Sequence, residues 1–221
     1  MLILAIDTST SAIAVGLTDG SGHTTSAARV DPRGHTEHLA PLVVQLLAEA
    51  GVTAGELTGI VVGTGPGPFT GLRVGMVTGL TMGLATGIPV HGVCSLDAVA
   101  AQAAQASFAA GDELLVATDA RRKEVYWAHY RVVEGGVARV GGPAVDLPAE
   151  VREELRRLPT AGRGPLLYPE LFTDAVEPLD VDAGVLAVLG AKGIEHGLAM
   201  PVDALYLRRP DALTTAERNA R

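Results

Sequence analysis

Short apolar runs alternate with polar turns at the start of the chain, and this pattern predicts β-strands. Residues 2–7 (LILAID) form a continuous apolar run with the length of a buried strand. A second apolar run covers residues 12–19, and the DGSG turn separates it from a third candidate strand at residues 23–30. We therefore expect two hairpins here, with the turn Asp-Thr-Ser-Thr-Ser joining the first two strands.

Residues 36–51 change to the helical period. Their apolar side chains recur at intervals of three and four residues, which places them along one face of an α-helix. These side chains are Leu39, Leu42, Val43, Leu46, Leu47 and Ala50. Because Pro41 is tolerated only near the first turn of a helix, we expect the helix to begin close to residues 36–38 and to end at Gly51.

Two further strand candidates follow. Residues 59–67 (GIVVGTGPG) predict a strand that runs into a tight loop, and residues 88–93 (IPVHGV) predict another strand. Strands that alternate with helices are typical of parallel crossover connections. Three antiparallel strands followed by such crossovers predict the ribonuclease-H-like plan of an α/β protein.

A second unit is expected to begin near residue 101. Residues 113–119 (ELLVATD) and 124–133 (EVYWAHYRVV) are predicted strands around the charged turn DARRK. Residues 148–158 predict an exposed helix with opposite charges three and four positions apart, and residues 184–197 predict another helix.

These elements suggest how the chain is divided. We expect a first lobe over residues 1–100, joined by part of the C-terminal segment, and a smaller second lobe over residues 101–200. Residues 201–221 form a C-terminal segment, and its polar tail from Pro210 is expected to be mobile.

Composition narrows the functional classes. The formal net charge is -8 over 221 residues. This argues against the chain being the main binding surface for a nucleic acid, because binding to the phosphate backbone needs clustered Lys and Arg. The single Cys94 excludes an internal disulfide and a cysteine-based zinc site. The start MLILAID lacks the basic region of a secretory signal, so a reducing, cytoplasmic setting is expected.

The stretch at residues 63–87 (GTGPGPFTGLRVGMVTGLTMGLATG) has three possible interpretations. A membrane span is disfavoured because Gly87 and Pro89 break the uncharged window that follows Arg73. A phosphate-binding loop has the right strand-to-helix context, but no Lys follows the glycines, and Pro66 and Pro68 each remove an N–H donor.

The third interpretation is a close-packing helix over residues 70–86. Glycines recur at every fourth position, and a row of Leu72, Met76, Leu80 and Leu84 runs beside them. Each interior Gly costs about 1 kcal/mol relative to Ala, so close backbone approach must compensate. The helix either packs tightly on its own sheet or, with the preceding helix, forms a face for a partner.

The partner-face hypothesis has specific candidates. They are His35, Leu39, Leu42, Val43, Leu46, Leu72, Gly75, Met76, Gly79, Leu80 and Gly83. Through the same face, the chain on its own is expected to form a two-fold symmetric homodimer.

Five motifs together resemble the bacterial TsaB family, also called YeaZ. LAIDTST, HTEHLAPLV, GTGPGPFTGLRVG, IPVHGVCSLDA and DARRKEVYWA occur in the family's order over residues 2–128. GPGPFTGLRVG and DARRKEVYWA are specific, whereas AIDTST alone is a weak signal. The rest of the chain matches more loosely, in length and in LYLR near the C-terminus.

The resemblance implies an actin- and Hsp70-like fold, with a cleft between two ribonuclease-H-like lobes. It also implies a role in making N6-threonylcarbamoyladenosine in tRNA, as a non-catalytic subunit that binds the related catalytic subunit TsaD. TsaD transfers the threonylcarbamoyl group to adenosine 37 of tRNAs that read codons beginning with A, and the ATPase TsaE completes the set. Contact of this chain with tRNA is expected to be indirect.

The resemblance also bears on metal binding. In TsaD, the strand that matches PVHGV leads into NHMEGH, whose two histidines hold a metal. Here Ser95 and Val99 stand at the matching positions, and valine cannot ligate a metal. We therefore expect no metal site and no required cofactor, while binding of ATP or ADP stays open.

A nucleotide or cleft site would draw on three turns. Actin-like ATPases place a magnesium-linked Asp at the end of the first strand, and Asp7 ends that strand here. The alternative is that Asp7 accepts N–H bonds from its own turn, and that the DARRK turn is a solvated hairpin. The candidates for this site are Asp7, Thr8, Ser9, Gly65, Gly67, Asp119 and Arg121.

Two alternative functions stay open. The chain could be an independent actin-like ATPase or small-molecule kinase that uses Asp7 and the loop at residues 63–71. It could also be a metallopeptidase-like enzyme, although His35 and His38, three positions apart, would need further ligands to hold a metal.

Overall fold

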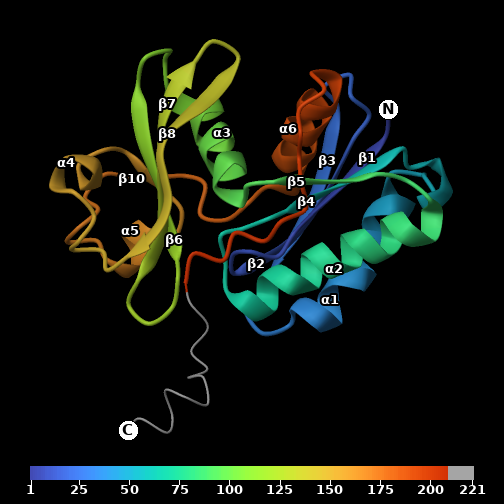
Figure 1. Ribbon diagram of the computed structural model, residues 1–221, viewed down its shortest axis with the longest axis horizontal. Coiled ribbons are helices and arrows are strands. Elements are labelled where there is room, and N and C mark those ends of the chain that lie inside the picture. The colour runs from blue at the N-terminus through green and yellow to red at the C-terminus, as the bar shows by residue number, and fades with distance from the viewer. Residues whose placement is uncertain (209–221) are drawn as a thin grey trace, which may run out of the picture.

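Two lobes, each built on a five-stranded mixed sheet, make up the molecule (Figure 1). The computed structural model describes residues 1–208. The predicted tail from Pro210 therefore lies outside the described residues. None of the helices in the described part of the chain combines the length and hydropathy of a membrane span.

The first sheet has the strand order β3-β2-β1-β4-β5. Antiparallel pairing joins the first three strands, and β1 then pairs in parallel with β4, which pairs in parallel with β5. The strands are β1 (Ile3–Asp7), β2 (Ala12–Thr18), β3 (Thr24–Val30), β4 (Gly59–Gly63) and β5 (Val90–Val93). This order confirms the predicted ribonuclease-H-like plan.

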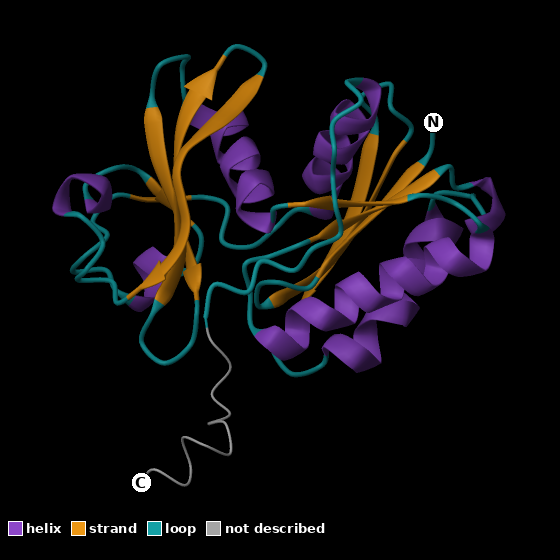
Figure 2. Ribbon diagram, viewed as in Figure 1, coloured by secondary structure: helices purple, strands orange, loops and turns teal. Residues whose placement is uncertain are grey.

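Helices cover both faces of the first sheet. Helices α1 (His35–Glu49) and α2 (Phe69–Thr86) lie on one face, and α6 (Ala183–Glu195) lies on the other (Figure 2). A short 3₁₀ helix (Ala54–Glu56) connects α1 to β4. Although α6 falls in the sequence range that we assigned to the second lobe, it returns to pack on β1 and β2.

The second sheet repeats the plan of the first. Its order is β10-β9-β6-β7-β8, with β6, β7 and β8 antiparallel and β9 and β10 added in parallel. Its strands are β6 (Glu113–Asp119), β7 (Val125–Val133), β8 (Gly136–Asp146), β9 (Thr160–Ala161) and β10 (Ala175–Val176). The duplicated plan confirms the expected fold of two ribonuclease-H-like lobes.

Helix α3 (Ser95–Ser107) packs on the second sheet and also against α6, between the two sheets (Figure 1). One continuous apolar core therefore spans both lobes and includes Val61 of β4, Val99 of α3, Tyr130 of β7 and Leu186 of α6. Because the lobes share this core, they are positioned relative to each other by packing as well as by chain connections.

Two local predictions need correction. The predicted helix at residues 148–158 shrinks to α4 (Glu153–Arg156), because Arg152 has the non-helical ψ of 137° and the helix can begin only after it. Pro41 lies well inside α1, which begins at His35 rather than at residues 36–38. The remaining short helix of the second lobe is α5 (Gly164–Leu167).

The glycine row of α2 faces its own sheet. A Cβ at Gly75 would lie 2.5 Å from Oγ1 of Thr8, and one at Gly79 would lie 2.3 Å from Cγ1 of Val62. At Gly83 it would lie 2.3 Å from Cγ2 of Val90. These distances are too short for any non-glycine residue, so the row allows α2 to approach β1, β4 and β5 closely.

The close approach can be tested at Gly79. Alanine normally favours a helix by about 1 kcal/mol over glycine. We nevertheless expect Gly79→Ala to lower the free energy of unfolding by about 1–3 kcal/mol, because the added methyl overpacks the contact with Val62. Urea denaturation measures the change, with Thr81→Ala on the exposed side of the same helix as the control. A Gly79→Ala protein as stable as the wild type would contradict this packing.

Candidate functional site

Asp7 ends β1 and is completely buried. Its Oδ1 accepts hydrogen bonds from the amide and the hydroxyl of Ser9, both at 2.8 Å, and its Oδ2 accepts one from the Ser95 hydroxyl at 2.5 Å. A Cβ at Gly63 would lie 1.8 Å from Oδ2. The carboxylate thus accepts bonds from its own turn, as one of the two interpretations predicted, and neighbouring atoms enclose it.

The surroundings of Asp7 also change its proton affinity. Burial raises the pKa of this carboxyl above its ordinary value, and the hydrogen bonds from Ser95 and Ser9 lower it in partial compensation. A magnesium-linked Asp in a nucleotide site must be ionised and open to its ligand. Asp7 is not open to such a ligand, because neighbouring atoms enclose it.

Ser95 and Val99, the residues compared above with the two histidines of the TsaD motif, are both fully buried in α3. The Ser95 hydroxyl donates to Asp7, and it accepts a hydrogen bond from the Gly65 amide at 3.1 Å. Val99 packs in the core shared by the lobes. Ser95 therefore links Asp7 to the loop that follows β4. Within residues 1–208, no three His, Cys, Asp or Glu side chains gather as a metal site would require.

The Thr8 side chain takes part in the backbone hydrogen bonding of α2. Its hydroxyl donates to the Gly71 carbonyl at 2.7 Å and accepts from the Gly75 amide at 2.8 Å. An α-helix would join these two backbone groups directly. The side chain thereby fixes the β1–β2 turn to the helix, and both partners must be glycines because a Cβ on either would lie within 3 Å of Thr8.

The predicted loop glycines pack on the same turn. A Cβ at Gly67 would lie 2.5 Å from the Ser9 carbonyl oxygen, and Gly65 has the positive φ of 87° that favours glycine. The Tyr126 hydroxyl of the second lobe donates to the Gly67 carbonyl at 3.3 Å. The Gly-Pro loop thus serves contact between chain segments and between lobes.

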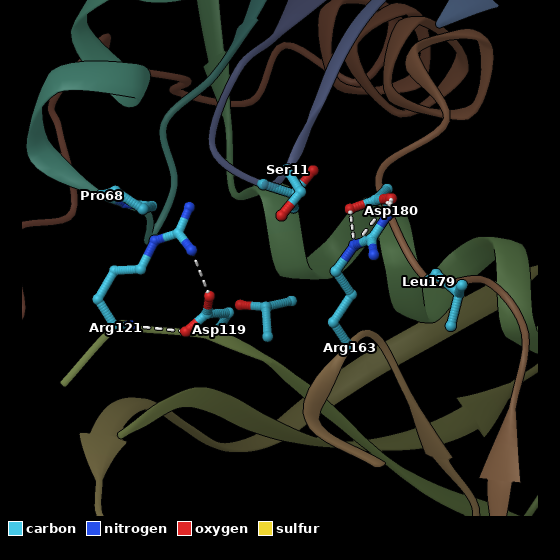
Figure 3. Close-up of a pocket in the computed structure, with 9 residues that line it drawn as sticks. Ser11, Pro68, Asp119, Arg121, Arg163, Leu179 and Asp180 are labelled. Atoms are coloured by element: carbon cyan, nitrogen blue, oxygen red, sulfur yellow. Dashed lines mark hydrogen bonds and ion pairs between the residues drawn. The ribbon is translucent and has the colours of Figure 1, made fainter. Parts of the chain in front are cut away.

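Asp119 and Arg121 lie at a small pocket between the lobes. The pocket is lined by Thr10, Ser11 and Pro68 from the first lobe and by Thr118, Asp119, Arg121, Arg163, Leu179 and Asp180 (Figure 3). Asp119 accepts from the Arg121 amide at 2.7 Å and from its Nη1 at 2.9 Å. Asp119 and Arg121 thus bind each other within one turn at the edge of this small pocket.

Arg163 and Asp180 complete this cleft, and the sequence did not single them out. Arg163 makes a bidentate contact through Nε at 2.9 Å and Nη2 at 2.6 Å to the two Asp180 oxygens (Figure 3). The two residues are 17 positions apart in the chain, with no motif around either of them. Arg121, Arg122 and Lys123 all have positive φ, between 53° and 66°, an uncommon run for non-glycine residues.

The predicted partner-face residues are mostly buried. His35, Leu39, Val43, Leu46, Leu72 and Met76 are at most 9% exposed, and Gly75, Gly79 and Gly83 face the sheet. Their helical stripes form the lobe core because each helix turns its main apolar side toward the sheet. Of the set, Leu80 is exposed and Leu42 is partly exposed. His35 lies 3.4 Å from the Thr10 carbonyl and His38 pairs with Asp31, so the two rings do not form a ligand pair.

A second apolar surface lies on the outer side of the same helices. We call Val77, Leu80 and Leu84 of α2 the outer stripe; they are 58%, 44% and 86% exposed. Val44 of α1 is 67% exposed. A helix that is apolar on both faces has a buried side and a side available for association. The structure therefore moves the candidate docking face from the glycine row to the outer stripe.

Comparison with known proteins gives a consistent result. A family model described as "TsaD: tRNA N6-adenosine threonylcarbamoyltransferase" matches residues 29–168. An uncharacterized protein of Mycobacterium leprae is 46% identical over 217 residues, covering 96% of this chain and 56% of that protein. The tRNA threonylcarbamoyladenosine biosynthesis protein TsaB of Escherichia coli is 36% identical over 176 residues, covering 77% of this chain and 75% of that protein.

Solved structures agree with these matches. YeaZ from Pseudomonas aeruginosa superimposes with a TM-score of 0.79 at 30% identity, covering 93% of this chain and 99% of that chain. Another P. aeruginosa structure, described as an uncharacterized protein with similarity to peptidase YeaZ, has a TM-score of 0.81 at 31% identity, covering 94% and 99%. The present chain spans about half the length of the M. leprae relative.

The raised pKa of Asp7 predicts how stability varies with pH. Since the folded chain holds this proton to higher pH than the unfolded chain, Asp7 makes the fold less stable as pH rises above about 4. We expect Asp7→Asn, which keeps the size of the side chain, to gain stability relative to the wild type as pH rises, by at most about 1.4 kcal/mol per pH unit. Urea unfolding from pH 4 to 8 measures this difference.

Asp19 provides the control, because hydrogen bonds from the Ser21 hydroxyl and amide hold the pKa of its exposed carboxyl below the ordinary value. The stability contributed by a carboxyl of lowered pKa is fully present above the unfolded pKa of about 4, so the difference between Asp19→Asn and the wild type should stay nearly flat from pH 5 to 8. If the Asp7→Asn difference is flat with pH, Asp7 has an ordinary pKa and our account of its burial is wrong.

Proposed function

This chain belongs to the TsaB (YeaZ) family, and on that basis we propose that it is a non-catalytic subunit of a tRNA-modifying complex. Its homology supports a role in the biosynthesis of threonylcarbamoyladenosine in tRNA. In this proposal the chain binds a TsaD-like catalytic subunit, together with a TsaE-like ATPase. The complex modifies adenosine 37 of tRNAs that read codons beginning with A, and this chain touches tRNA only indirectly.

The outer stripe of α2 is the observation that carries the proposal. Large apolar side chains this exposed on one helix face are typical of a protein–protein contact. Val44 of α1 extends the surface to the neighbouring helix, so a partner could pack helix against helix. The same surface would let two copies of this chain associate when the partner is absent.

The interior of the cleft supports a scaffold role. Asp7 is enclosed, Ser95 is bonded to it, and Val99 is a core residue. The pocket between the lobes is lined by Arg and Asp side chains that already bind each other. The side chains that could contact a ligand are thus already engaged in packing or in hydrogen bonds with each other.

Two alternative functions make different predictions. An independent ATPase or small-molecule kinase would bind Mg-ATP in isothermal calorimetry, and a metallopeptidase-like enzyme would hold stoichiometric metal after purification. We expect neither signal from the isolated chain. Stoichiometric binding in either experiment would replace the scaffold proposal with the corresponding enzyme.

A charge on the outer stripe should prevent docking. We expect Leu84→Asp to weaken binding to the TsaD-like subunit of the same organism by at least about 100-fold, because docking would bury an unpaired carboxylate. Calorimetry measures the affinity, and nucleoside analysis of tRNA from a reconstituted reaction should show a matching loss of threonylcarbamoyladenosine.

Leu166→Asp is the control, because Leu166 is also an exposed leucine on a helix, 59% against 86% for Leu84, but lies on the second lobe. Its affinity and product yield should equal those of the wild type. The proposal fails if the wild-type chain forms no complex and the modification proceeds equally well without it. If Leu84→Asp binds normally, docking uses a different surface.

A further inference from the structure

Arg73 is the single charged residue of α2, whose sequence is FTGLRVGMVTGLTMGLAT. It lies on the exposed side of the helix, in line with the outer stripe. Phe69, Arg73, Val77, Leu80 and Leu84 follow one another at steps of four, four, three and four residues, which keeps them on one helical face. A partner that covers the outer stripe and extends along this face past Val77 therefore meets this guanidinium.

Two aromatic rings hold the Arg73 side chain in place. Its Cζ lies 3.6 Å from the centroid of the Phe69 ring and 5.8 Å from that of Tyr206. Its Nε donates to the Tyr206 hydroxyl at 2.9 Å, and the two rings lie 5.1 Å apart. Phe69 is 50% exposed and Tyr206 45% exposed, so this cluster is part of the surface.

Tyr206 belongs to the C-terminal segment, which is fixed to both lobes. The Gly92 amide donates to the Met200 carbonyl at 3.0 Å, and the Leu205 amide donates to the Thr64 carbonyl at 2.9 Å. Arg208 forms an ion pair with Glu124 of the second lobe. The segment thus presents Tyr206 to α2 in a defined position rather than as a loose end.

The chemistry of this cluster constrains the partner. In residues 1–208 the two terminal nitrogens of Arg73 have no hydrogen-bond partner, and α2 contains no acidic residue that could neutralise them. Burying a lone charge in an apolar interface is costly unless an opposite charge meets it. A planar guanidinium whose orientation is fixed by stacking is suited to a carboxylate bound through two hydrogen bonds.

We propose that the docking partner presents a carboxylate to Arg73, and that Tyr206 makes the C-terminal segment a third element of the docking surface. The inference rests on the proposed function and specifies its partner: a protein helix that is apolar opposite the outer stripe and carries an Asp or Glu at the end that meets Arg73. Tyr206 acts as a positioning residue, because it fixes the guanidinium before the partner arrives.

Affinity for the TsaD-like subunit tests the inference. We expect Arg73→Gln to weaken binding by about tenfold or more, and Arg73→Glu to weaken it further by repulsion. Arg73→Lys keeps the charge but loses the fork and the stacking, so it should fall between the wild type and Arg73→Gln. Tyr206→Phe keeps the ring and removes the hydroxyl, and we expect a loss of about two- to fivefold.

Two readouts separate a contact from a structural role. Binding by the wild type should weaken with added salt more steeply than binding by Arg73→Gln, since one ion pair is absent from the variant. An Asp or Glu on the partner, replaced by Arg, should recover binding to Arg73→Glu but not to the wild type. Thermal unfolding checks that each variant is folded, and Arg157→Gln, an exposed arginine of the second lobe, is the matched control.

The outcomes distinguish this inference from the proposed function. If Leu84→Asp abolishes docking while Arg73→Gln and Tyr206→Phe bind like the wild type, the docking face stands and the Arg73 contact is refuted. If the Arg73 variants impair only self-association of this chain, the occupant is a second copy and the inference is wrong. If Leu84→Asp also binds normally, the proposed docking face fails together with it.

Discussion

The close contact between α2 and the first sheet is the constraint on which the rest of the structure depends. Four glycines, Gly71, Gly75, Gly79 and Gly83, leave no side chain along the row of α2 that lies closest to the sheet. The helix can then lie against Thr8, Val62 and Val90, and the Thr8 hydroxyl can enter its hydrogen-bond ladder. The larger apolar side chains of α2 therefore lie either beside the glycine row, where they are buried, or on the opposite side of the helix, where they are exposed.

This division explains why an apolar surface remains exposed. Leu72 and Met76 complete the core beside β4, whereas Val77, Leu80 and Leu84 have no sheet to cover. In a protein that acted alone, such a stripe would promote association without benefit. In a subunit it supplies a docking surface that needs no rearrangement of the lobe.

The same tight packing encloses the turn that follows β1. The β1–β2 turn is bonded to α2 through Thr8, to α3 through the contact of Asp7 with Ser95, and to the Gly-Pro loop through the close approach of Gly67. Hydroxyl groups and glycines thus hold the β1–β2 turn against its neighbours.

Local patterns were sufficient to predict most of the elements. Apolar runs and turn residues placed the five strands of the first sheet, β6 and β7 close to their observed bounds, since a buried strand needs a continuous apolar segment. The strands β8, β9 and β10 were not predicted. The order of those strands followed from the ribonuclease-H-like plan. The helix at residues 148–158 was wrong over most of its length, because charge spacing does not determine backbone conformation and Arg152 has a non-helical ψ.

The candidate site was harder to predict. A glycine row marks a close contact, but whether it faces a sheet or a partner depends on residues such as Val62 and Val90 that contact it in the fold. The apolar stripe of α1 was assigned to a partner although it covers its own sheet. Arg163 pairs with Asp180 across 17 residues, and Arg73 pairs with Tyr206 across 133 residues. No local sequence pattern predicts such pairs.

The central claim is that a partner subunit covers the outer stripe. It is tested most directly by measuring whether the stripe becomes shielded from solvent in the complex. The one native thiol, Cys94, is buried, and burial together with the nearby Asp97 raises its pKa to about 12, so it should react slowly. A cysteine in place of Leu84 would then report on the outer stripe alone. We expect its modification by a water-soluble maleimide to be fast in the isolated chain and to slow at least about tenfold with saturating TsaD-like subunit. An unchanged rate in a complex that has formed would contradict the account.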